Sequence, residues 1–397
     1  MSRKPILGAR RAEGIRYAVR DIVLVAREAQ RAGKEMLYLN IGDPNAFDFE
    51  TPPHIVEAIC RAVRDNLTSY APSEGLPAAL DAIRQDAEER SNIKNILDVH
   101  IGTGSSECIE ITLGALVNPD EEVLTPSPGY PLYSATIAKL GAVEVPYHLD
   151  EANEWQPDLE DIAQKVSAQT RAIIVINPNN PTGSVCTRET LEKILALAAR
   201  HDLVVFADEI YDRLVLDGVK HVSIASLTTE VPVLTFNGLS KAYLGPGLRI
   251  GWCIASGPSE PMRPFIEAIH RFLRARLCAN HPVQHAVVPA LRGTQTHIKH
   301  TIERLQRRRD ITVEMLNAID GIRCVRPSAA FYAFPRLENV VDDKAWVEAL
   351  VRETGVVVVH GSGFGQRPGT AHFRVVYLPP EEILEKAFSR VRDFHAK

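Results

Sequence analysis

The stretch that decides the fold runs from Thr235 to Trp252 and reads TFNGLSKAYLGPGLRIGW. A short apolar run ends in small residues, and a single lysine, Lys241, follows the point where the predicted strand ends. Most lysines lie on the protein surface, so one interpretation of Lys241 is an ordinary loop residue. The alternative is a covalent anchor for a cofactor. The choice between them depends on what the neighbouring strands place beside this lysine.

The composition excludes several classes of protein. The chain has 397 residues, of which 45% are hydrophobic and 24% charged, as in soluble proteins with room for two domains. Its net charge of −5 gives no reason to expect nucleic acid or an anionic membrane as partner. There is no apolar run of roughly 18 residues and no signal-peptide core. The six cysteines form no C-x-x-C pair, so we expect no metal site and a reducing, cytoplasmic location.

Strands and helices alternate in the middle of the chain. Residues 171–177, 203–209 and 231–237 are continuous β-branched or apolar runs, which is typical of strands buried on both faces. Residues 187–202 have helical apolar spacing, and Thr187 is a good N-cap. This alternation predicts an α/β fold with a mainly parallel sheet flanked by helices.

Three unlike polar groups follow these three strands. Asn180 comes just after the first strand, Asp208 ends the second, and Lys241 follows the third. Because ligands of open α/β sheets bind beyond the carboxyl ends of the strands, we expect the three side chains to converge on one site. Taken singly, Asn180 could be only a turn former, and Asp208 a helix cap or an ion-pair partner.

Pyridoxal phosphate is the cofactor that needs an amide, a carboxylate and a lysine together. Its aldehyde condenses with a lysine amine, here that of Lys241, and its ring nitrogen needs an acidic partner, here Asp208. Asn180 and Tyr211 could donate hydrogen bonds to its phenolic oxygen. A lysine amine with a pKa of about 7–8 would suit proton transfer at neutral pH.

Three segments together resemble the class I/II aminotransferases of fold type I, which depend on pyridoxal phosphate. They are NPNNPTG at 177–183, ADEIYD at 207–212 and SKAYLGPGLRIGW at 240–252. Each motif is moderately specific, but the ordered set is highly specific, and the resemblance covers nearly the whole chain.

The resemblance implies two domains. The large domain, which binds the cofactor, is expected at 51–290, and a smaller α+β domain at 1–50 and 291–397. Residues 297–319 are predicted to form a long amphipathic helix that leads into the small domain. The three arginines at 307–309 are predicted to lie on its solvated face.

The segment 100–116 reads as a small-residue turn that opens a helix. Backbone N–H groups at a helix N-terminus bind phosphate, so Ser105 and Ser106 are the predicted contacts and Gly104 allows close approach. A dinucleotide fingerprint is the competing interpretation. It fails because Glu107 replaces the third glycine and because we expect only a very short strand before the turn.

Further cofactor contacts follow from the resemblance alone. Ser240 and Arg249 correspond to other phosphate ligands of the family, and a guanidinium can pair with two phosphate oxygens. Tyr130 stands where the family stacks an aromatic residue on the pyridine ring, with core packing as the alternative. Tyr70 matches the tyrosine that crosses to the neighbouring subunit's phosphate, which implies a homodimer.

The resemblance also indicates where an amino-acid substrate would bind. Arg374, in AHFRVVYL at 371–378, corresponds to the arginine that holds the α-carboxylate. Asn180 and the backbone of Gly42 would complete that pocket. His360 stands where proline is commoner, and we interpret it as structural.

The N-terminal segment gives the clue to the substrate. Residues 15–30 are similar to the YAVRG stretch of alanine aminotransferases, as are residues 39–47, although Asp21 replaces the usual glycine. The likeness implies that Tyr17 closes over the side-chain pocket and that Arg20 binds the distal carboxylate of glutamate or 2-oxoglutarate. The alternative is a surface helix start with Tyr17 packed on the core.

The function predicted from these features is amino transfer between L-alanine and 2-oxoglutarate, giving pyruvate and L-glutamate. Two enzymatic alternatives remain: a broad aromatic or branched-chain aminotransferase, and a pyridoxal-phosphate-dependent β-lyase on the same fold. A regulator with a degenerate aminotransferase domain is a third alternative. It is disfavoured because the aminotransferase pattern begins almost at the first residue and every cofactor residue is kept.

Overall fold

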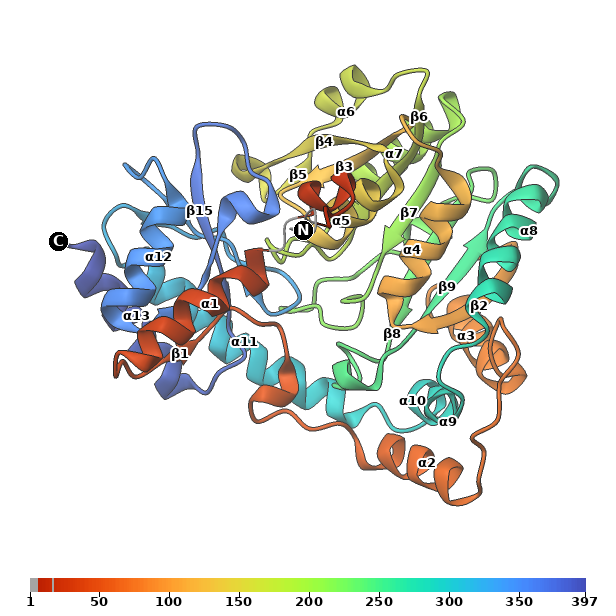
Figure 1. Cartoon of the computed structure of the whole chain (residues 1–397), viewed down its shortest axis with the longest axis horizontal. Coiled ribbons are helices and arrows are strands. Elements are labelled where there is room, and N and C mark those ends of the chain that lie inside the picture. The colour runs from red at the N-terminus through yellow and green to blue at the C-terminus, as the bar shows by residue number, and fades with distance from the viewer. Residues whose placement is uncertain (1–5, 16–17) are drawn as a thin grey trace, which may run out of the picture.

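The computed structural model describes residues 6–15 and 18–397, without the side chains of Arg10, Val19 and Arg20. A large sheet with helices on both faces stands beside a smaller body that contains the C-terminus (Figure 1). No helix within the described ranges is long and apolar enough to cross a membrane.

The large sheet has eight strands and carries the centre of the fold. In spatial order they are β2 (Ile96–Thr103), β9 (Ile250–Ser256), β8 (Val233–Gly238), β7 (Val204–Asp208), β6 (Thr170–Ile176), β3 (Glu122–Ser127), β4 (Val143–Asp150) and β5 (Gln156–Pro157). The run from β8 to β4 is parallel throughout, whereas β9 is antiparallel to both its neighbours and β5 to β4. The predicted mainly parallel α/β sheet is therefore confirmed.

Burial on both faces explains why the central strands are continuous apolar runs. Along β6, Ile173 and Val175 belong to one hydrophobic cluster, while Ile174 and Ile176 belong to the cluster on the opposite face. Helices α4 (Ser105–Leu116), α5 (Pro131–Leu140) and α8 (Ser259–Arg276) cover the second of these faces. The first is covered mainly by α3 (Pro77–Glu89), α6 (Leu159–Lys165) and α7 (Arg188–Arg200).

The smaller body joins the two ends of the chain. Its strands are β10 (Ile322–Arg323), β12 (Arg336–Leu337), β15 (Ala371–Val376), β11 (Tyr332–Ala333) and β14 (Val359–His360), with β1 (Leu37–Tyr38) parallel to β13 (Val356–Val357). Its helices are α1 (Ala18–Arg31), α11 (Thr296–Asn317), α12 (Asp343–Thr354) and α13 (Glu381–His395) (Figure 1). Through the β1–β13 pair, the N-terminal segment packs against the C-terminal part of the chain.

The remaining elements are short or lie at one end of the large sheet. They are α2 (Pro53–Arg64), α9 (His281–Gln284), α10 (Val287–Arg292) and the 3-10 turns η1 (Arg10–Gly14), η2 (Pro44–Ala46), η3 (Glu151–Asn153), η4 (Ile224–Leu227), η5 (Pro246–Leu248) and η6 (Gly361–Phe364).

Of the predictions about single helices and strands, two are confirmed and one is wrong. Helix α7 begins where expected, because the Thr187 hydroxyl accepts a hydrogen bond from the Thr190 N–H. Helix α11 confirms the predicted long helix. The prediction of a very short strand before the phosphate turn is wrong. This strand, β2, has eight residues, because it pairs with β9 along almost its whole length.

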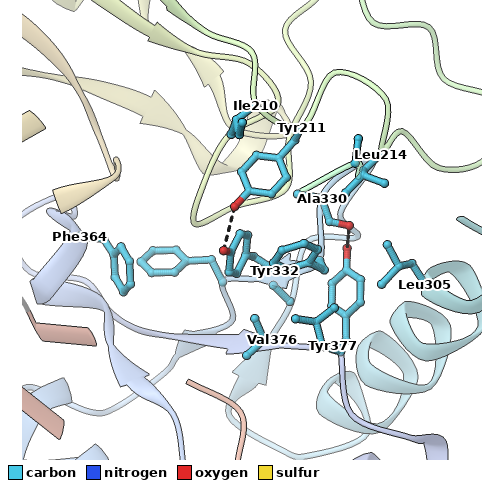
Figure 2. Close-up of a cluster of buried hydrophobic side chains, with 14 of the residues drawn as sticks. Ile210, Tyr211, Leu214, Leu305, Ala330, Tyr332, Phe364, Val376 and Tyr377 are labelled. Atoms are coloured by element: carbon cyan, nitrogen blue, oxygen red, sulfur yellow. Dashed lines mark hydrogen bonds between the residues drawn. The ribbon is translucent and has the colours of Figure 1, made fainter. Parts of the chain in front are cut away.

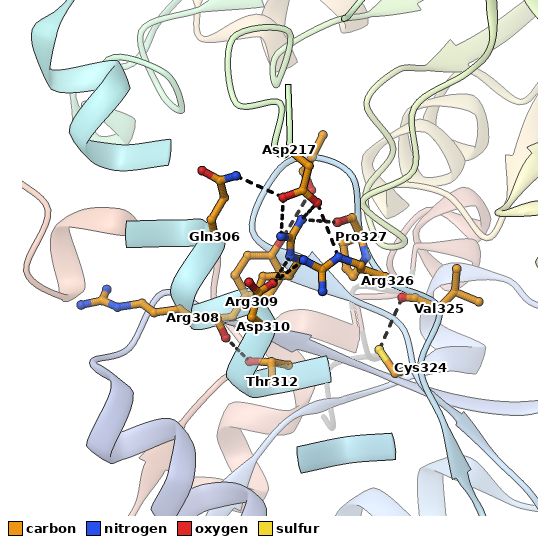
Figure 3. A network of polar contacts seen from close by, with 12 residues as sticks. Asp217, Gln306, Arg308, Arg309, Asp310, Thr312, Cys324, Val325, Arg326 and Pro327 are labelled. Carbon is orange, nitrogen blue, oxygen red and sulfur yellow. Dashed lines mark hydrogen bonds and ion pairs between the residues drawn. The ribbon is translucent and has the colours of Figure 1, made fainter. Parts of the chain in front are cut away.

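The arginines at 307–309 correct a second prediction. Arg307 is exposed, but Arg308 and Arg309 are buried, not solvated. Arg308 forms a bidentate pair with Asp48 at 2.7 and 2.9 Å. Arg309 donates to both oxygens of Asp217 at 2.7 and 2.8 Å, as Figure 3 shows. Two of these three helical arginines are therefore buried by contacts with segments far apart in the sequence. The spacing of the arginines along the helix does not reveal those contacts.

The Arg309–Asp217 pair yields a prediction about stability. The Asp217→Asn substitution removes the two-oxygen partner of a buried guanidinium, which keeps its single contact with the Asp310 carboxylate. Because Asp217 is 43% exposed, we expect a loss of about 1–2 kcal/mol in the free energy of unfolding at pH 7. The hydrogen bonds from Arg309 lower the pKa of Asp217 to about 2. The stabilisation from Asp217 is then complete above about pH 4 and disappears as the pH falls toward 2.

Chemical denaturation at several pH values measures this effect. The control is Asp393→Asn, which removes only an exposed pair with Arg392 and should cost less than about 0.5 kcal/mol. Equal stability of the two variants at pH 7 would contradict the assignment.

Candidate active site

The carboxyl ends of three neighbouring strands deliver the predicted polar groups. Asn180 follows β6, Asp208 is the last residue of β7, and Lys241 follows β8. Lys241 is close enough to Asp208 and Arg374 for their charges to act on its amine. The Arg374 guanidinium in turn donates a hydrogen bond to the Asn180 side-chain oxygen. The structure thus brings together the residues that the sequence placed at separate strand ends.

Lys241 is not an ordinary surface lysine. Its side chain is half-buried, and its Nζ donates to the carbonyl oxygen of Gly42 at 2.9 Å. Burial, together with the positive charges of Arg374 and Arg249, lowers the pKa of Lys241 to about 8, against the opposing effect of Asp43 and Asp208. The share of free amine near neutral pH is therefore far larger than for an ordinary lysine.

Asp208 is a buried carboxylate with few partners. Its Oδ2 accepts a hydrogen bond from the Tyr133 hydroxyl at 3.1 Å, and its Oδ1 accepts one from the Ile210 N–H at 3.3 Å. Burial raises the pKa of Asp208 to about 6, while those hydrogen bonds and the charge of Lys241 pull it down. The group is charged at neutral pH and is positioned to accept a cationic donor.

Arg374 lies in strand β15 and is buried at 2% exposure. One terminal nitrogen donates to the Asn180 side-chain oxygen at 3.1 Å and the other to the backbone carbonyl of Asn40 at 2.5 Å. The guanidinium also stacks between the rings of Tyr332 and Phe364, each centred 4.6 Å away. The backbone carbonyl of Asn40 is thus a partner of this arginine, while the role predicted for the Gly42 backbone, beside the substrate carboxylate, stays a prediction.

Tyr211 is part of an aromatic cluster beside Lys241. Its hydroxyl lies 2.9 Å from the Tyr332 hydroxyl, and either oxygen can be the donor (Figure 2). Burial raises the pKa of Tyr211 well above its usual value, so the phenol stays protonated. The hydroxyl predicted to donate to a cofactor therefore remains a donor at every working pH.

The phosphate turn has the geometry that a close-fitting anion site requires. Gly104 precedes α4 with φ +76°, and a Cβ there would lie 2.4 Å from the Arg249 guanidinium. A Cβ on Gly251 would lie 2.1 Å from the Ser105 backbone nitrogen. Glycine at 104 lets the arginine lie over the helix start, where its Nη2 is 3.4 Å from the Ser106 hydroxyl. Glycine at 251 lets the backbone of the helix start approach β9.

The other predicted residues are placed as follows. Ser240 is buried in the turn after β8. Tyr130 is half-buried at the start of α5 and lines a cavity of about 620 Å³. Tyr70, after α2, is 82% exposed. Tyr17 lies outside the described residues, as does the side chain of Arg20.

His360 lies beside that cavity and makes a local contact. Its Nδ1 is 2.7 Å from the Ser362 hydroxyl, and burial lowers the pKa of the imidazole. A neutral histidine bonded to its own turn is consistent with the structural interpretation.

Sequence reasoning missed three neighbours of the site. Tyr133 contacts Asp208, Asn40 contacts Arg374, and Tyr332 contacts both Tyr211 and Arg374. A weak signal existed for Tyr133, which lies one helical turn after Tyr130. No local pattern marked the other two, because their contacts join distant segments.

Comparison with known families agrees with this geometry. The family described as "Aminotransferase class I and II" matches residues 34–391. The chain therefore belongs to the class I and II aminotransferases, a family of transaminases whose members depend on pyridoxal phosphate.

Individual relatives are similar along almost the full length. The glutamate-pyruvate aminotransferase AlaA of Escherichia coli K12 is 38% identical over 398 residues, covering 98% of each chain. An alanine aminotransferase of Mycobacterium tuberculosis H37Rv is 40% identical over 377 residues, which is 93% of this chain and 87% of the relative. The solved structure of an alanine aminotransferase from Pyrococcus furiosus has a TM-score of 0.95 and 40% identity, covering 98% of this chain and all of that one.

The described residues fit the family's cofactor. The glycine-lined start of α4 under Arg249 leaves backbone N–H groups facing a site for a phosphate. Asp208 offers a buried carboxylate for a protonated ring nitrogen, and Lys241 offers an amine with a lowered pKa for an aldehyde. The donor set therefore matches both ends of pyridoxal phosphate.

The phosphate turn yields a second prediction. In Gly251→Ala, the new methyl group collides with the backbone at Ser105, so α4 must shift. We expect about 1–3 kcal/mol lower stability and at least tenfold weaker binding of pyridoxal phosphate.

The matched control is Gly247→Ala, also close to Arg249 in sequence, because a Cβ at Gly247 has nothing within 4 Å. Thermal unfolding and cofactor titration check both variants. If Gly251→Ala bound the cofactor as tightly as Gly247→Ala, the close-approach argument would be wrong.

Proposed function

We propose that this chain transfers the α-amino group between L-alanine and 2-oxoglutarate, giving pyruvate and L-glutamate, with pyridoxal phosphate as cofactor. The observation that carries the proposal is the half-buried Lys241, with a pKa of about 8, beside Asp208 and Arg374. Relatives named for alanine or glutamate-pyruvate transamination, at 38–40% identity over at least 93% of this chain, support the choice of substrates.

Particular residues would hold the cofactor. Lys241 is the covalent anchor, Asp208 the partner of the ring nitrogen, and Tyr130 the stacking residue. Asn180 and Tyr211 would donate hydrogen bonds to the phenolic oxygen of the cofactor. The phosphate would be held by a set that shares the start of α4 and the turn after β8, namely Gly104, Ser105, Ser106, Ser240 and Arg249. When bound, pyridoxal phosphate supplies an electron-withdrawing ring that makes the substrate Cα proton acidic.

Side chains of the protein would perform the remaining work. Arg374, oriented by Asn180 and Asn40, binds the substrate carboxylate and fixes Cα beside Lys241. The free amine of Lys241 would take the proton at Cα and return it to the C4′ carbon of the cofactor. A tethered base held in this way can reach effective molarities of about 10⁵ M or more. The stack of Tyr332 and Phe364 on Arg374 limits the rotation of the guanidinium.

The third prediction concerns Lys241. Replacing it in Lys241→Ala removes both the anchor and the base, so the absorbance band of lysine-bound cofactor and nearly all turnover should disappear. Lys220→Ala, at an exposed lysine, is the control and should keep both. Normal turnover by purified Lys241→Ala would refute the proposed mechanism.

One experiment separates the alternatives. The holoenzyme is mixed with each amino acid in turn, and the loss of the lysine-bound absorbance band is recorded. Alanine and glutamate should be the best donors if the proposal holds. Fast bleaching by aromatic or branched-chain amino acids would favour the broad-specificity alternative. Release of ammonia without any need for a keto acid would identify a β-lyase.

The assembly, domains and compartment are also proposed. A homodimer in which Tyr70 reaches the partner subunit's phosphate is supported by the 82% exposure of that tyrosine in the single chain. We propose domains at 51–290 and at 1–50 with 291–397, consistent with the β1–β13 pairing. A cytoplasmic location is proposed because all six cysteines are free.

The fourth prediction concerns Arg20 as the residue that binds the distal carboxylate. Arg20→Ala should weaken 2-oxoglutarate and glutamate by at least tenfold while sparing pyruvate and alanine, which lack that carboxylate. Arg27→Ala, at an exposed arginine of the same helix α1, is the control. Steady-state KM values for 2-oxoglutarate and pyruvate test this prediction. An equal rise in KM for both keto acids would contradict the assignment of Arg20 to the distal carboxylate.

A further inference from the structure

The surroundings of Asp208 contain a group that the proposed chemistry has not used. Tyr133 lies in the first turn of α5 and is only 1% exposed. Its hydroxyl donates to Asp208 Oδ2 at 3.1 Å across the core, between the start of α5 and the end of β7. Burial raises the pKa of Tyr133 well above its usual value, so this phenol keeps its proton and acts as a donor.

The hydrogen bond from Tyr133 matters because, among the residues that the structure describes, few other groups stabilise the charge of Asp208. Its other hydrogen bond, from the Ile210 N–H, is long at 3.3 Å, and Lys241 acts on it only through space. Burial favours the protonated carboxyl. A donor to the charged form opposes that tendency, and a hydrogen bond to a charged acceptor is stronger than one between neutral groups.

We propose that Tyr133 is a positioning residue that keeps Asp208 ionised, so that the proton shared with the cofactor resides on the ring nitrogen and not on the carboxylate. The inference rests on the proposed function, because it concerns the partner of the cofactor ring. Only the position of one proton changes: it lies on nitrogen with Asp208 charged, or on Asp208 with the nitrogen neutral. A charged ring withdraws electrons from the substrate Cα, and a neutral ring does so weakly.

Tyr133→Phe isolates the effect because it removes the hydroxyl and keeps the ring. The control is Tyr147→Phe. Tyr147 is equally buried at 1%, and its hydroxyl donates at 2.7 Å to the carbonyl of Ile174, away from Asp208. Both variants lose one buried hydrogen bond, and thermal unfolding of each holoenzyme shows how far stability falls.

The primary measurement is the ¹⁵N resonance of the ring nitrogen in holoenzyme loaded with ¹⁵N-pyridoxal phosphate. Wild type and Tyr147→Phe should give a protonated-pyridine signal. Tyr133→Phe should move the signal toward neutral pyridine, by about a tenfold change in the equilibrium between the two proton positions. An unchanged resonance in Tyr133→Phe, or an equal shift in Tyr147→Phe, would overturn the inference.

A kinetic comparison separates this inference from the proposed function. In the half-reaction with alanine, Tyr133→Phe should slow about tenfold with pyridoxal phosphate. It should be unaffected with the ring N-methyl analogue, whose ring charge is permanent. Equal slowing with both cofactors would overturn the role of Tyr133 while leaving the transaminase intact. Failure of the wild type to react with any amino acid would instead remove the proposed function and this inference with it.

Discussion

The site depends on the pairing of β6, β7 and β8 as adjacent parallel strands. Parallel strands end at the same edge of a sheet, so the residues that follow them must meet there. The proximity of Asn180, Asp208 and Lys241 follows from that register. The apolar clusters on both faces hold the three strands in place. Asp208 ends one of these strands, and Asn180 and Lys241 stand in the short turns that follow the other two.

Burial at this edge sets the chemistry of the groups it delivers. The same desolvation lowers the pKa of Lys241 to about 8 and raises that of Asp208 to about 6. Each shift moves the group toward neutral pH, where it can exchange or share a proton. The opposing interactions are few and specific, and Tyr133 supplies one of them, at Asp208.

The sequence allowed the three central parallel strands and the polar groups at their ends to be predicted. Buried parallel strands are continuous apolar runs, and turn-forming residues mark where they end. It failed at Arg308 and Arg309, whose helical spacing resembles a solvated face. Their burial depends on Asp48 and Asp217, which are distant in the chain. The short-strand expectation for β2 failed for a similar reason, since its length is set by the pairing partner β9.

The sequence by itself determined which chemical groups are available and at which strand ends they stand, because those features are local. Lys241, Asp208, Asn180 and the glycine-rich turns are of this kind. Only the tertiary structure decided how the groups are oriented and charged. The contacts of Asn40 and Tyr332 with Arg374, and of Tyr133 with Asp208, join segments far apart in the chain. Desolvation is likewise a property of everything packed around a residue, and no local pattern of residues encodes it.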